Sequence, residues 1–514
     1  HTSILGAAKL TGRTPSRLSV AALAAVTGRE TVRTFDASTR TFGDAVVAPL
    51  TGYAVAAAQQ QFGASGSTIE AVLTAVHRDL DHGSALSNIL SRDALSGIVE
   101  GRIRWGGGTY DASAHAGFTH VRGDSGAILL LQRSSARYWQ RPDADHVDID
   151  PRRLTLGGTM LGINHSKLAG AHWLWDIDLW QESPGLEPND IGAFGSVDDR
   201  GVAWDLVYRE TTPRGWYRWY RIAFGTATEW NFDGVNRGTD MFLDFNTTFA
   251  NYYELSSDFW YDLRGVSDDL ARGGPLMGTG REWGMRLELE NREGARTSWG
   301  VELGADRNEL GGWSRDVEGS LSFHPGTQWE ISLDPSWERA VDTRQYVMTV
   351  DSGRAETFGR RYVFAHVDRS EIAARLRVNY TFTPNLTLET YAEPFASSGR
   401  YHSFGELRAA RSRDLLEYGT NGTTIVTNPD GSRTVTTDGR SFDIDNEDFN
   451  VRSLRSNVVL RWEWRPGSAL FVVWQQDQEA DRPFRRVRPG DLWDALSTSG
   501  DSFFAVKVSY WLPL

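Results

Sequence analysis

The fold of this chain is decided by residues 372–382, which read Ile-Ala-Ala-Arg-Leu-Arg-Val-Asn-Tyr-Thr-Phe. Every second residue from Ile372 to Phe382 is apolar or aromatic, and the residues between them include Arg375 and Arg377. Successive side chains of a β-strand point to opposite faces, so the stretch predicts a strand with one apolar and one polar face. Residues 383–385, Thr-Pro-Asn, are typical of a tight turn.

The same alternation recurs along the chain. Large apolar or aromatic side chains occupy most of the alternate positions in segments 173–179, 241–249, 283–289, 317–323 and 458–464. Between such segments, short turns alternate with long polar connections. The long ones are expected near 28–50, 78–93, 123–153, 184–200, 231–239, 264–280, 341–360, 397–448 and 480–500. This asymmetry is typical of outer-membrane barrels, which have short periplasmic turns and long extracellular loops.

We therefore expect an all-β fold, a transmembrane antiparallel up-and-down β-barrel of about 20–22 strands. Residues 1–514 should form one barrel domain with two large extracellular insertions. The insertion near 123–153 is predicted to be partly helical, with Asp124 as N-cap. The insertion near 397–448 should contain a hairpin around residues 428–431, Asn-Pro-Asp-Gly. The first strand should run toward the turn side, so a further strand-forming segment or a domain is expected ahead of His1.

A β-sandwich or propeller is the soluble alternative, because its strands also have one apolar face. Three features favour a barrel. Aromatic residues such as Phe323, Phe382 and Trp462 crowd the apolar face near the turns, where a membrane interface would lie. The opposite face is charged along its length. Only a closed sheet satisfies its backbone hydrogen bonds inside lipid.

Composition excludes several other classes. The chain has 514 residues, 54 Lys+Arg and 67 Asp+Glu, and so a net charge of −13, which argues against nucleic acid as a partner. It has no Cys, which removes disulfides and thiolate sites. No stretch approaches the roughly 18 apolar residues of a membrane helix.

Several motifs carry a family resemblance. They are residues 4–12 (ILGAAKLTG), 25–30 (AVTGRE), 135–143 (SARYWQRPD), 187–190 (EPND), 379–386 (NYTFTPNL) and 507–511 (KVSYW). With them, nearly the whole chain resembles an uncharacterised bacterial outer-membrane β-barrel domain, a domain of unknown function. In that family the barrel usually follows a periplasmic module that resembles carbohydrate-binding family 9. The resemblance implies fold and location but no substrate.

The C-terminal strand resembles the assembly signal of outer-membrane barrels. Apolar residues alternate from Phe504 to Leu514, although the last residue is Leu and not the usual aromatic residue. The expected partners are therefore outer-membrane lipid, the barrel-assembly machinery and, through the family, a periplasmic carbohydrate-binding-like module or another subunit.

Charged residues on the polar face are the main functional candidates, because rings of charge in a pore select solutes. The alternative is that they pair across strands and only fill the interior. The candidate lumen-lining residues are Arg375, Arg377, Arg461, Glu463, Arg286, Glu288, Glu290, Asp176 and Asp178.

A calcium site is a weaker candidate. Asp143, Asp145, Asp148 and Asp150 place oxygen ligands at close intervals in one loop, and residues 443–448 form a second acidic run. Neither run has the full EF-hand spacing, and an ordinary solvated loop is the simpler interpretation. No other cofactor is expected.

Catalysis is not expected. The 11 His are scattered, and the chain contains neither a G-x-S-x-G elbow nor an H-E-x-x-H helix. The favoured function is an outer-membrane channel or translocator for polar solutes, or for a substrate delivered by a periplasmic module. A plugged barrel that acts through its extracellular loops is the first alternative, and a hydrolase with its site at the barrel rim is the second.

Overall fold

We describe the protein from a computed structural model that covers residues 2–188, 195–291 and 294–511. The backbone divides into two compact units. Unit 1 comprises His1–Tyr208, Phe224–Met241 and Arg264–Thr279, and unit 2 comprises Arg209–Ala223, Phe242–Leu263 and Gly280–Leu514. Among the described residues, no helix has the length and apolar character needed to cross a membrane.

Strands dominate both units. Those that begin in unit 1 are β1 (Ile4–Arg13), β2 (Leu18–Thr27), β3 (Glu30–Asp36), β4 (Thr41–Ala48), β5 (Thr51–Phe62), β6 (Ser67–Arg78), β7 (Asp93–Trp105), β8 (Tyr110–Arg122), β9 (Thr155–Lys167), β10 (Trp173–Glu182), β11 (Asp199–Glu210), β13 (Asn236–Phe249), β15 (Val266–Ser267) and β16 (Met277–Gly278). Those that begin in unit 2 are β12 (Tyr217–Trp230), β14 (Glu254–Asp262), β17 (Glu282–Glu290), β18 (Thr297–Asn308), β19 (Trp313–Phe323), β20 (Trp329–Asp351), β21 (Arg360–Thr383), β22 (Leu386–Leu407), β23 (Leu415–Glu417), β24 (Thr424–Thr427), β25 (Arg433–Thr437), β26 (Arg440–Ile444), β27 (Phe449–Arg465), β28 (Ser468–Asp481) and β29 (Gly500–Ser509).

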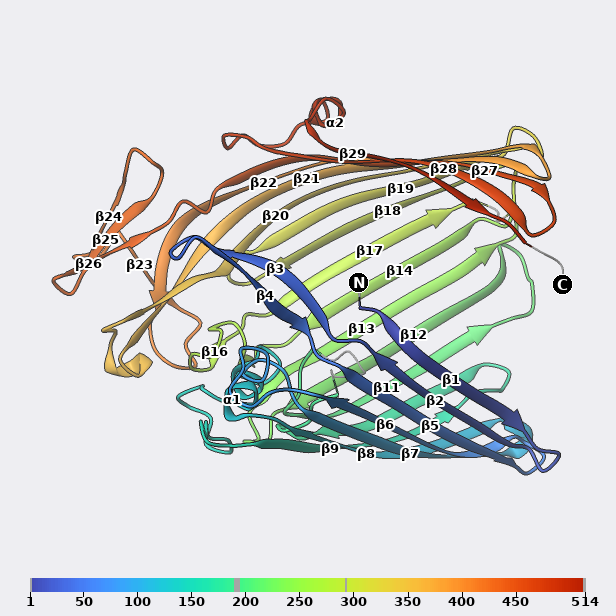
Figure 1. Ribbon diagram of the computed structural model, residues 1–514, viewed down its shortest axis with the longest axis horizontal. Coiled ribbons are helices and arrows are strands. Elements are labelled where there is room, and N and C mark those ends of the chain that lie inside the picture. The colour runs from blue at the N-terminus through green and yellow to red at the C-terminus, as the bar shows by residue number, and fades with distance from the viewer. Residues whose placement is uncertain (1, 189–194, 292–293, 512–514) are drawn as a thin grey trace. The chain divides into compact units, whose positions relative to one another are not determined.

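The main sheet contains 22 of these strands and is antiparallel, which confirms the predicted up-and-down all-β class and strand number. Neighbours along the chain pair as hairpins (Figure 1). Where strands are skipped, as in the β2–β5 and β14–β17 ladders, the skipped strands form small separate sheets in the loops.

Short turns alternate with longer connections, as predicted. Residues 14–17, 63–66, 384–385 and 466–467 are tight turns, whereas residues 123–154 and 408–448 are long insertions. The loops predicted near 341–360 and 397–448 are present but shorter than predicted, since they span residues 352–359 and 408–448. Next to them, β20, β21 and β22 continue as paired strands of 23, 24 and 22 residues. Their polar outer segments looked like loops, but ladder hydrogen bonds do not require an apolar face.

The two predicted loop elements are present. Helix α1 spans Ser125–Arg133, and β24 and β25 form the hairpin around residues 428–431. Asp124 is at the N-cap of α1, but its side chain accepts from Nδ1 of His82 (2.9 Å) and from the backbone of Gly83 (3.1 Å), not from the helix. The remaining helical elements are η1 (Gly106–Gly108), η2 (Ala355–Thr357) and α2 (Asp491–Ala495). The end of the predicted C-terminal signal, residues 512–514, lies outside the described residues.

One face of the strands exposes apolar side chains along their length. In unit 1, Ile163 of β9 is 57% exposed and Leu179 of β10 is 47% exposed, and the two residues are directly opposite each other. In unit 2, Val301 and Leu303 of β18 are 41% and 47% exposed. Water would disfavour such stripes, whereas paired strands that present them to acyl chains are how a sheet crosses a bilayer. The protein is thus an outer-membrane protein, as predicted.

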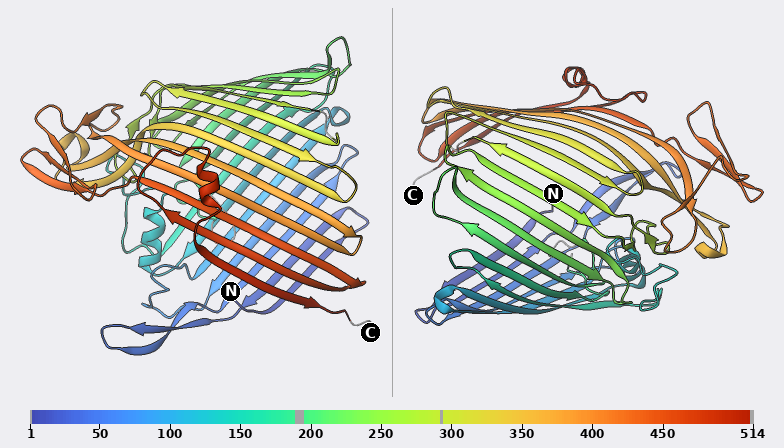
Figure 2. Two further views of the ribbon diagram at one scale, coloured as in Figure 1. Left: turned by 90° about the horizontal axis from the view of Figure 1, so that it is seen from above. Right: turned by 180° about the vertical axis from the view of Figure 1, so that it is seen from behind.

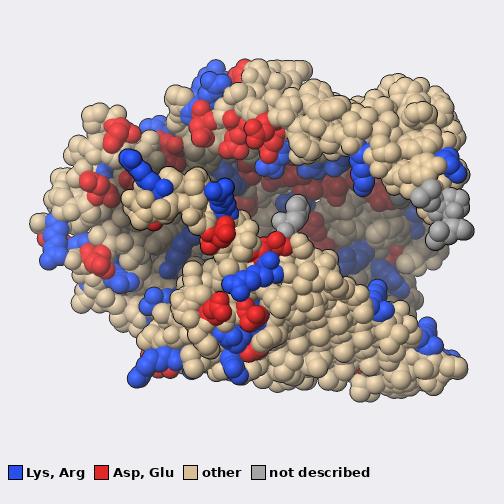
Figure 3. Space-filling view, in the orientation of Figure 1, with Lys and Arg blue, Asp and Glu red and all other residues tan. Residues whose placement is uncertain are grey.

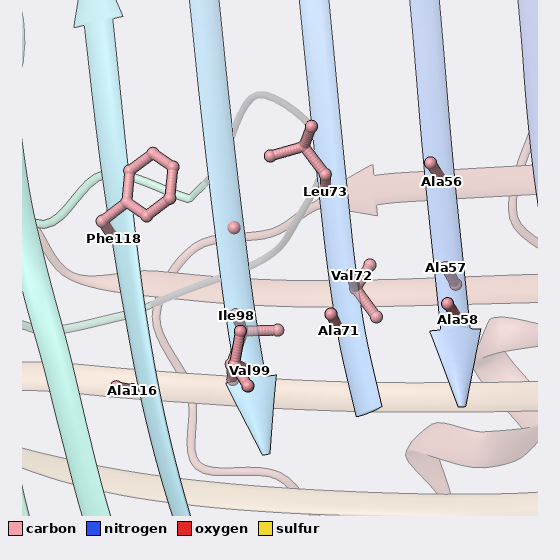
Figure 4. A pocket seen from close by; sticks show the side chains of 11 residues that line it. Ala56, Ala57, Ala58, Ala71, Val72, Leu73, Ile98, Val99, Ala116 and Phe118 are labelled. Carbon is pink, nitrogen blue, oxygen red and sulfur yellow. The ribbon is translucent and has the colours of Figure 1, made fainter. Parts of the chain in front are cut away.

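The lipid-facing surface of β5–β8 is built from small residues. Ala56, Ala58, Ala71, Gly97 and Ala116 leave a shallow apolar depression that is rimmed by larger side chains (Figure 4). The lining carries no charged group, so lipid chains can fill it without loss of hydrogen bonds.

Candidate functional site

Three glutamates meet on the polar face of unit 2. Glu288 of β17 is directly opposite Glu302 of β18, and Glu302 is directly opposite Glu318 of β19. Directly opposite residues of adjacent strands have Cβ atoms about 4.5–5.5 Å apart, and like charges in such pairs destabilise a sheet. The arrangement therefore costs stability, which points to a role other than holding the sheet together.

Further carboxylates extend this row on the same face. Asp316 of β19 is opposite Glu338 of β20, which in turn is opposite Glu371 of β21. We call Glu288, Glu302, Asp316, Glu318, Glu338 and Glu371 the acidic belt. Figure 3 shows acidic and basic groups together on the hollowed part of the surface.

Arginine neutralises only part of the acidic belt. Nε of Arg286 lies 2.6 Å from Oε1 of Glu302, and Arg369 pairs with Glu338. Among the described residues, neither Glu288 nor Glu318 has an ion-pair partner. The belt thus keeps a net negative charge, and its side chains are partly exposed.

A cavity of about 310 Å³ lies beside the belt, toward the turn end of the strands. Its polar lining includes Glu254, Glu290, Ser320 and Asp334. It is too small for a large ligand, but a hydrated cation or a small polar solute fits its size and charge.

The predicted arginines of β21 are also on the polar face, where they are paired. Arg375 Nη2 lies 3.4 Å from Oε1 of Glu393, and Arg377 Nη1 lies 3.9 Å from Oδ2 of Asp334. Both arginines are almost half exposed, so these pairs are weakly held. They place a mixed-charge strip next to the acidic belt.

The other predicted lumen residues form two local clusters. In unit 2, Arg461 Nη2 lies 2.8 Å from Oε2 of Glu463 near the tight turn after β27. In unit 1, Asn164 Nδ2 donates to both Asp176 (2.9 and 3.0 Å) and Asp178 (2.9 Å). Asp176 is opposite Asp205, so unit 1 also carries acidic groups on its polar face. The sequence-based candidates therefore share the predicted face but do not meet at one point.

The candidate residues predicted from the sequence did not include Glu302, Glu318, Asp316, Glu338 and Glu371. Each occupies the polar phase of an alternating strand, so a systematic count of both phases would have found them. Their convergence could not be found in this way, because the register between strands depends on turn geometry.

The predicted calcium aspartates serve separate purposes in the loops of unit 1. Asp143 Oδ2 accepts from the backbone N of Leu276 (2.8 Å), whereas Asp150 Oδ1 accepts from the backbone N of Arg152 (2.9 Å). The backbone N of Asp145 donates to Asp233. Across the described ranges, no three acidic or histidine side chains form a group suited to a metal ion. Calcium binding by Asp143, Asp145, Asp148 and Asp150 stays an untested prediction.

A buried ion network joins these loops. Arg141, whose side chain is 1% exposed, lies 3.7 Å from both Asp198 and Asp268. His146 Nε2 lies 2.7 Å from Asp198, and its Nδ1 lies 2.9 Å from Asp233. Burial opposes the protonation of His146, but the two carboxylates outweigh it and raise the pKa of the imidazole. With both nitrogens engaged, His146 serves as a clamp between loops and not as a free base.

The outer segments of β20–β22 have a core of their own. Val363, Phe404, Tyr418, Val435 and Ile444 pack together with β23–β26. A second buried network lies beside them. Nη1 of Arg361 donates to both oxygens of Glu406 at 2.7 Å, and the hydroxyl of Tyr418 donates to Glu406 at 2.9 Å. This extracellular part of unit 2 is therefore ordered by burial and ion pairing.

Most of the chain matches the model of a known protein family. The family model described as "Domain of unknown function (DUF5916)" matches residues 1–92 and 124–513. A search of curated proteins finds no match. A link to a carbohydrate-binding module is not part of these findings.

Similar solved structures include three iron-related proteins. The ferric enterobactin receptor PfeA of Pseudomonas aeruginosa has a TM-score of 0.38 and 7% identity, with 90% of this chain and 76% of that chain covered. The FrpB iron transporter of Neisseria meningitidis (F3-3 variant) has a TM-score of 0.41 and 8% identity, with 91% of this chain and 74% of that chain covered. The siderophore receptor PirA of Acinetobacter baumannii has a TM-score of 0.36 and 8% identity, with 97% of this chain and 81% of that chain covered. At these TM-scores, the ligands and mechanisms of these proteins cannot be assigned to this chain. The fold follows from the chain's own strands and their pairing.

Proposed function

The chain belongs to the family described as domain of unknown function DUF5916, and we propose that it acts there as an outer-membrane channel or translocator for polar solutes that favours cations. The observation that carries this proposal is the register of Glu288, Glu302 and Glu318 on three adjacent strands. A charged wall facing water concentrates counter-ions and sets the selectivity of a pore.

The stability cost of the acidic belt supports a role in selection. Structural pairs on a sheet face are expected to alternate in sign, because opposite charges stabilise and like charges destabilise. Arg286 forms an ion pair with Glu302, whereas Glu288 and Glu318 have no ion-pair partner among the described residues and are left to act on solute.

Conductance in planar bilayers tests the proposal. The native protein should conduct, and its reversal potential in a KCl gradient should report cation preference. The triple variant Glu288→Gln, Glu302→Gln and Glu318→Gln should still conduct, with a cation-to-anion permeability ratio that falls toward unity. The matched control removes three exposed carboxylates outside the acidic belt through Asp351→Asn, Asp414→Asn and Asp445→Asn, and should keep the native ratio.

The outcomes separate the candidate functions. A silent native protein that is correctly inserted would overturn the channel and favour the plugged barrel. A conducting triple variant with unchanged selectivity would remove the acidic belt from the proposal. Hydrolysis of an ester or peptide substrate by the native protein would instead support the rim-site enzyme.

The plugged barrel acting through its loops is the second candidate. The core of β20–β26 and the Arg361–Glu406 network favour it, because an ordered extracellular surface can bind a ligand. Delivery of a substrate by a periplasmic module, and insertion by the barrel-assembly machinery, are proposed partnerships that fit either candidate.

A further inference from the structure

The segment between β28 and β29, residues 482–499, crosses the outside of unit 2. We call it the strap. It contains α2, and Figures 1 and 2 both show α2 outside the strands of this unit. The buried residues of the strap include Val487, Asp491 and Ala495, and the arginines around Val487 are exposed.

Specific contacts fasten the strap to the strands. The backbone N of Val487 donates to Oγ of Ser398 (3.2 Å), and Nδ2 of Asn450 donates to two strap carbonyls at 3.1 and 3.0 Å. Asp491 is buried and lies 2.9 Å from Nη2 of Arg452. Burial opposes ionisation of Asp491, but a backbone N–H of the strap together with Arg452 and Arg485 lowers its pKa. The strap thus has a fixed place.

That place is on the lipid-facing side of the sheet. Ser398 is in the same phase of β22 as Leu386, which is opposite the 48% exposed Trp462 of β27. Asn450 and Arg452 are in the same phase of β27 as Leu460 and Trp462. Because side chains two residues apart share a face, the strap covers the outward face and not the polar one.

The strap lies at the level of the membrane–water interface. Along β20 the outward residues are apolar up to Trp337, which is 38% exposed, and the next outward residue is Arg339. Arg339 pairs with Asp368 of β21, and strap residue Arg486 also pairs with Asp368, at 2.7 Å. Tryptophan marks the boundary between acyl chains and headgroups, so the strap begins where the headgroups lie.

The strap has the composition of a headgroup-binding segment. Within residues 482–488 there are four arginines: Arg482, Arg485, Arg486 and Arg488. Large apolar side chains accompany them, with Trp493 75%, Leu496 45% and Phe484 38% exposed. In a chain with a net charge of −13, such a basic and aromatic cluster is unusual. Among the described residues, the guanidinium groups of Arg482 and Arg488 have no acidic partner.

We propose that the strap binds the phosphate groups of phosphorylated glycolipids in the outer leaflet. Arginine holds phosphate through two parallel, charge-assisted hydrogen bonds, and Arg482 and Arg488 are free to make them. Trp493 and Leu496 insert at the acyl boundary and keep the arginines at phosphate depth. The proposal depends on outer-membrane location and not on whether the barrel conducts.

Native mass spectrometry of the full chain in detergent micelles tests the phosphate contacts. The probes are bisphosphorylated lipid A and the same lipid A without phosphates. The variant Arg482→Gln with Arg488→Gln should bind bisphosphorylated lipid A about 30-fold more weakly, which corresponds to the loss of two surface cations near an anionic lipid. The control Arg411→Gln with Arg440→Gln removes two exposed cations of unit 2 that have no ion-pair partner within the described part of the chain, and should bind like the native protein.

Two results would overturn the proposal. One is equal binding of the phosphorylated and dephosphorylated lipids, and the other is equal binding by the strap variant and its control. Heat-modifiable migration on gels shows that every variant is folded.

The position of the strap is tested separately by fluorescence. The emission of Trp493, obtained as the difference between the native protein and Trp493→Phe, should be quenched in vesicles of brominated phosphatidylcholine. An unquenched difference spectrum would place Trp493 away from the bilayer and would contradict the proposed anchor.

Discussion

Strands β2 and β5 of unit 1 differ from strands β17–β19 of unit 2 on the face turned away from lipid. In β2 and β5 that face presents residues such as Ala21, Leu23, Val55 and Ala57. In β17–β19 it presents Glu288, Glu302 and Glu318. Both groups form regular antiparallel ladders, so charge on this face is not needed for strand pairing. The acidic belt is therefore a feature of β17–β19 and their neighbours, and not a general property of the sheet.

The largest expected effect comes from placing a charge on the lipid-facing side of β18. Leu303→Arg should cost about 2–4 kcal/mol of folding free energy in the bilayer, because it places a charge against acyl chains. The matched substitution at the neighbouring residue, Glu302→Gln, alters the other face and should leave insertion intact. Urea titration of the protein refolded in vesicles measures both. Equal costs at the two positions would contradict the assignment of faces.

A smaller effect should come from relieving repulsion in the acidic belt. Glu318→Gln removes one of two like charges that are directly opposite each other and should stabilise the folded protein by about 0.2–1 kcal/mol. Glu302→Gln should gain less, since it also loses the ion pair with Arg286. The same urea titrations distinguish the two. Destabilisation by Glu318→Gln would mean that the belt supports the fold.

The smallest effect is expected in the N-terminal strands. Leu23→Arg should change the folding free energy by no more than about 0.5 kcal/mol, because Leu23 is already exposed and faces away from lipid. Its neighbour Ala22, on the lipid-facing side, is the control, and Ala22→Arg should cost about 2–4 kcal/mol of folding free energy, as Leu303→Arg does. If both substitutions in β2 cost this much, the apolar face of β2 does not contact water, and the comparison between the two regions would need revision.

Local sequence determined much of this protein. The two-residue period of stretches such as 372–382, together with the tight turns, predicted the strands, their two faces, the strand number and the side with long loops. These features follow from the sequence because the alternation of apolar and polar residues within one strand fixes its two faces, whichever strands lie beside it. The hairpin at 428–431 and helix α1 were predictable for the same reason.

What the sequence left undetermined depended on contacts between distant residues. The extension of β20–β22 beyond the membrane follows from pairing with neighbours and from the core around Phe404, and no apolar alternation signals it. The meeting of Glu288, Glu302 and Glu318 depends on register across two turns. The strap is placed by contacts with Ser398, Asn450 and Arg452, which lie 30 or more residues from their strap partners. A periodic pattern fixes which way each side chain points, but only the tertiary structure decides which side chains it meets.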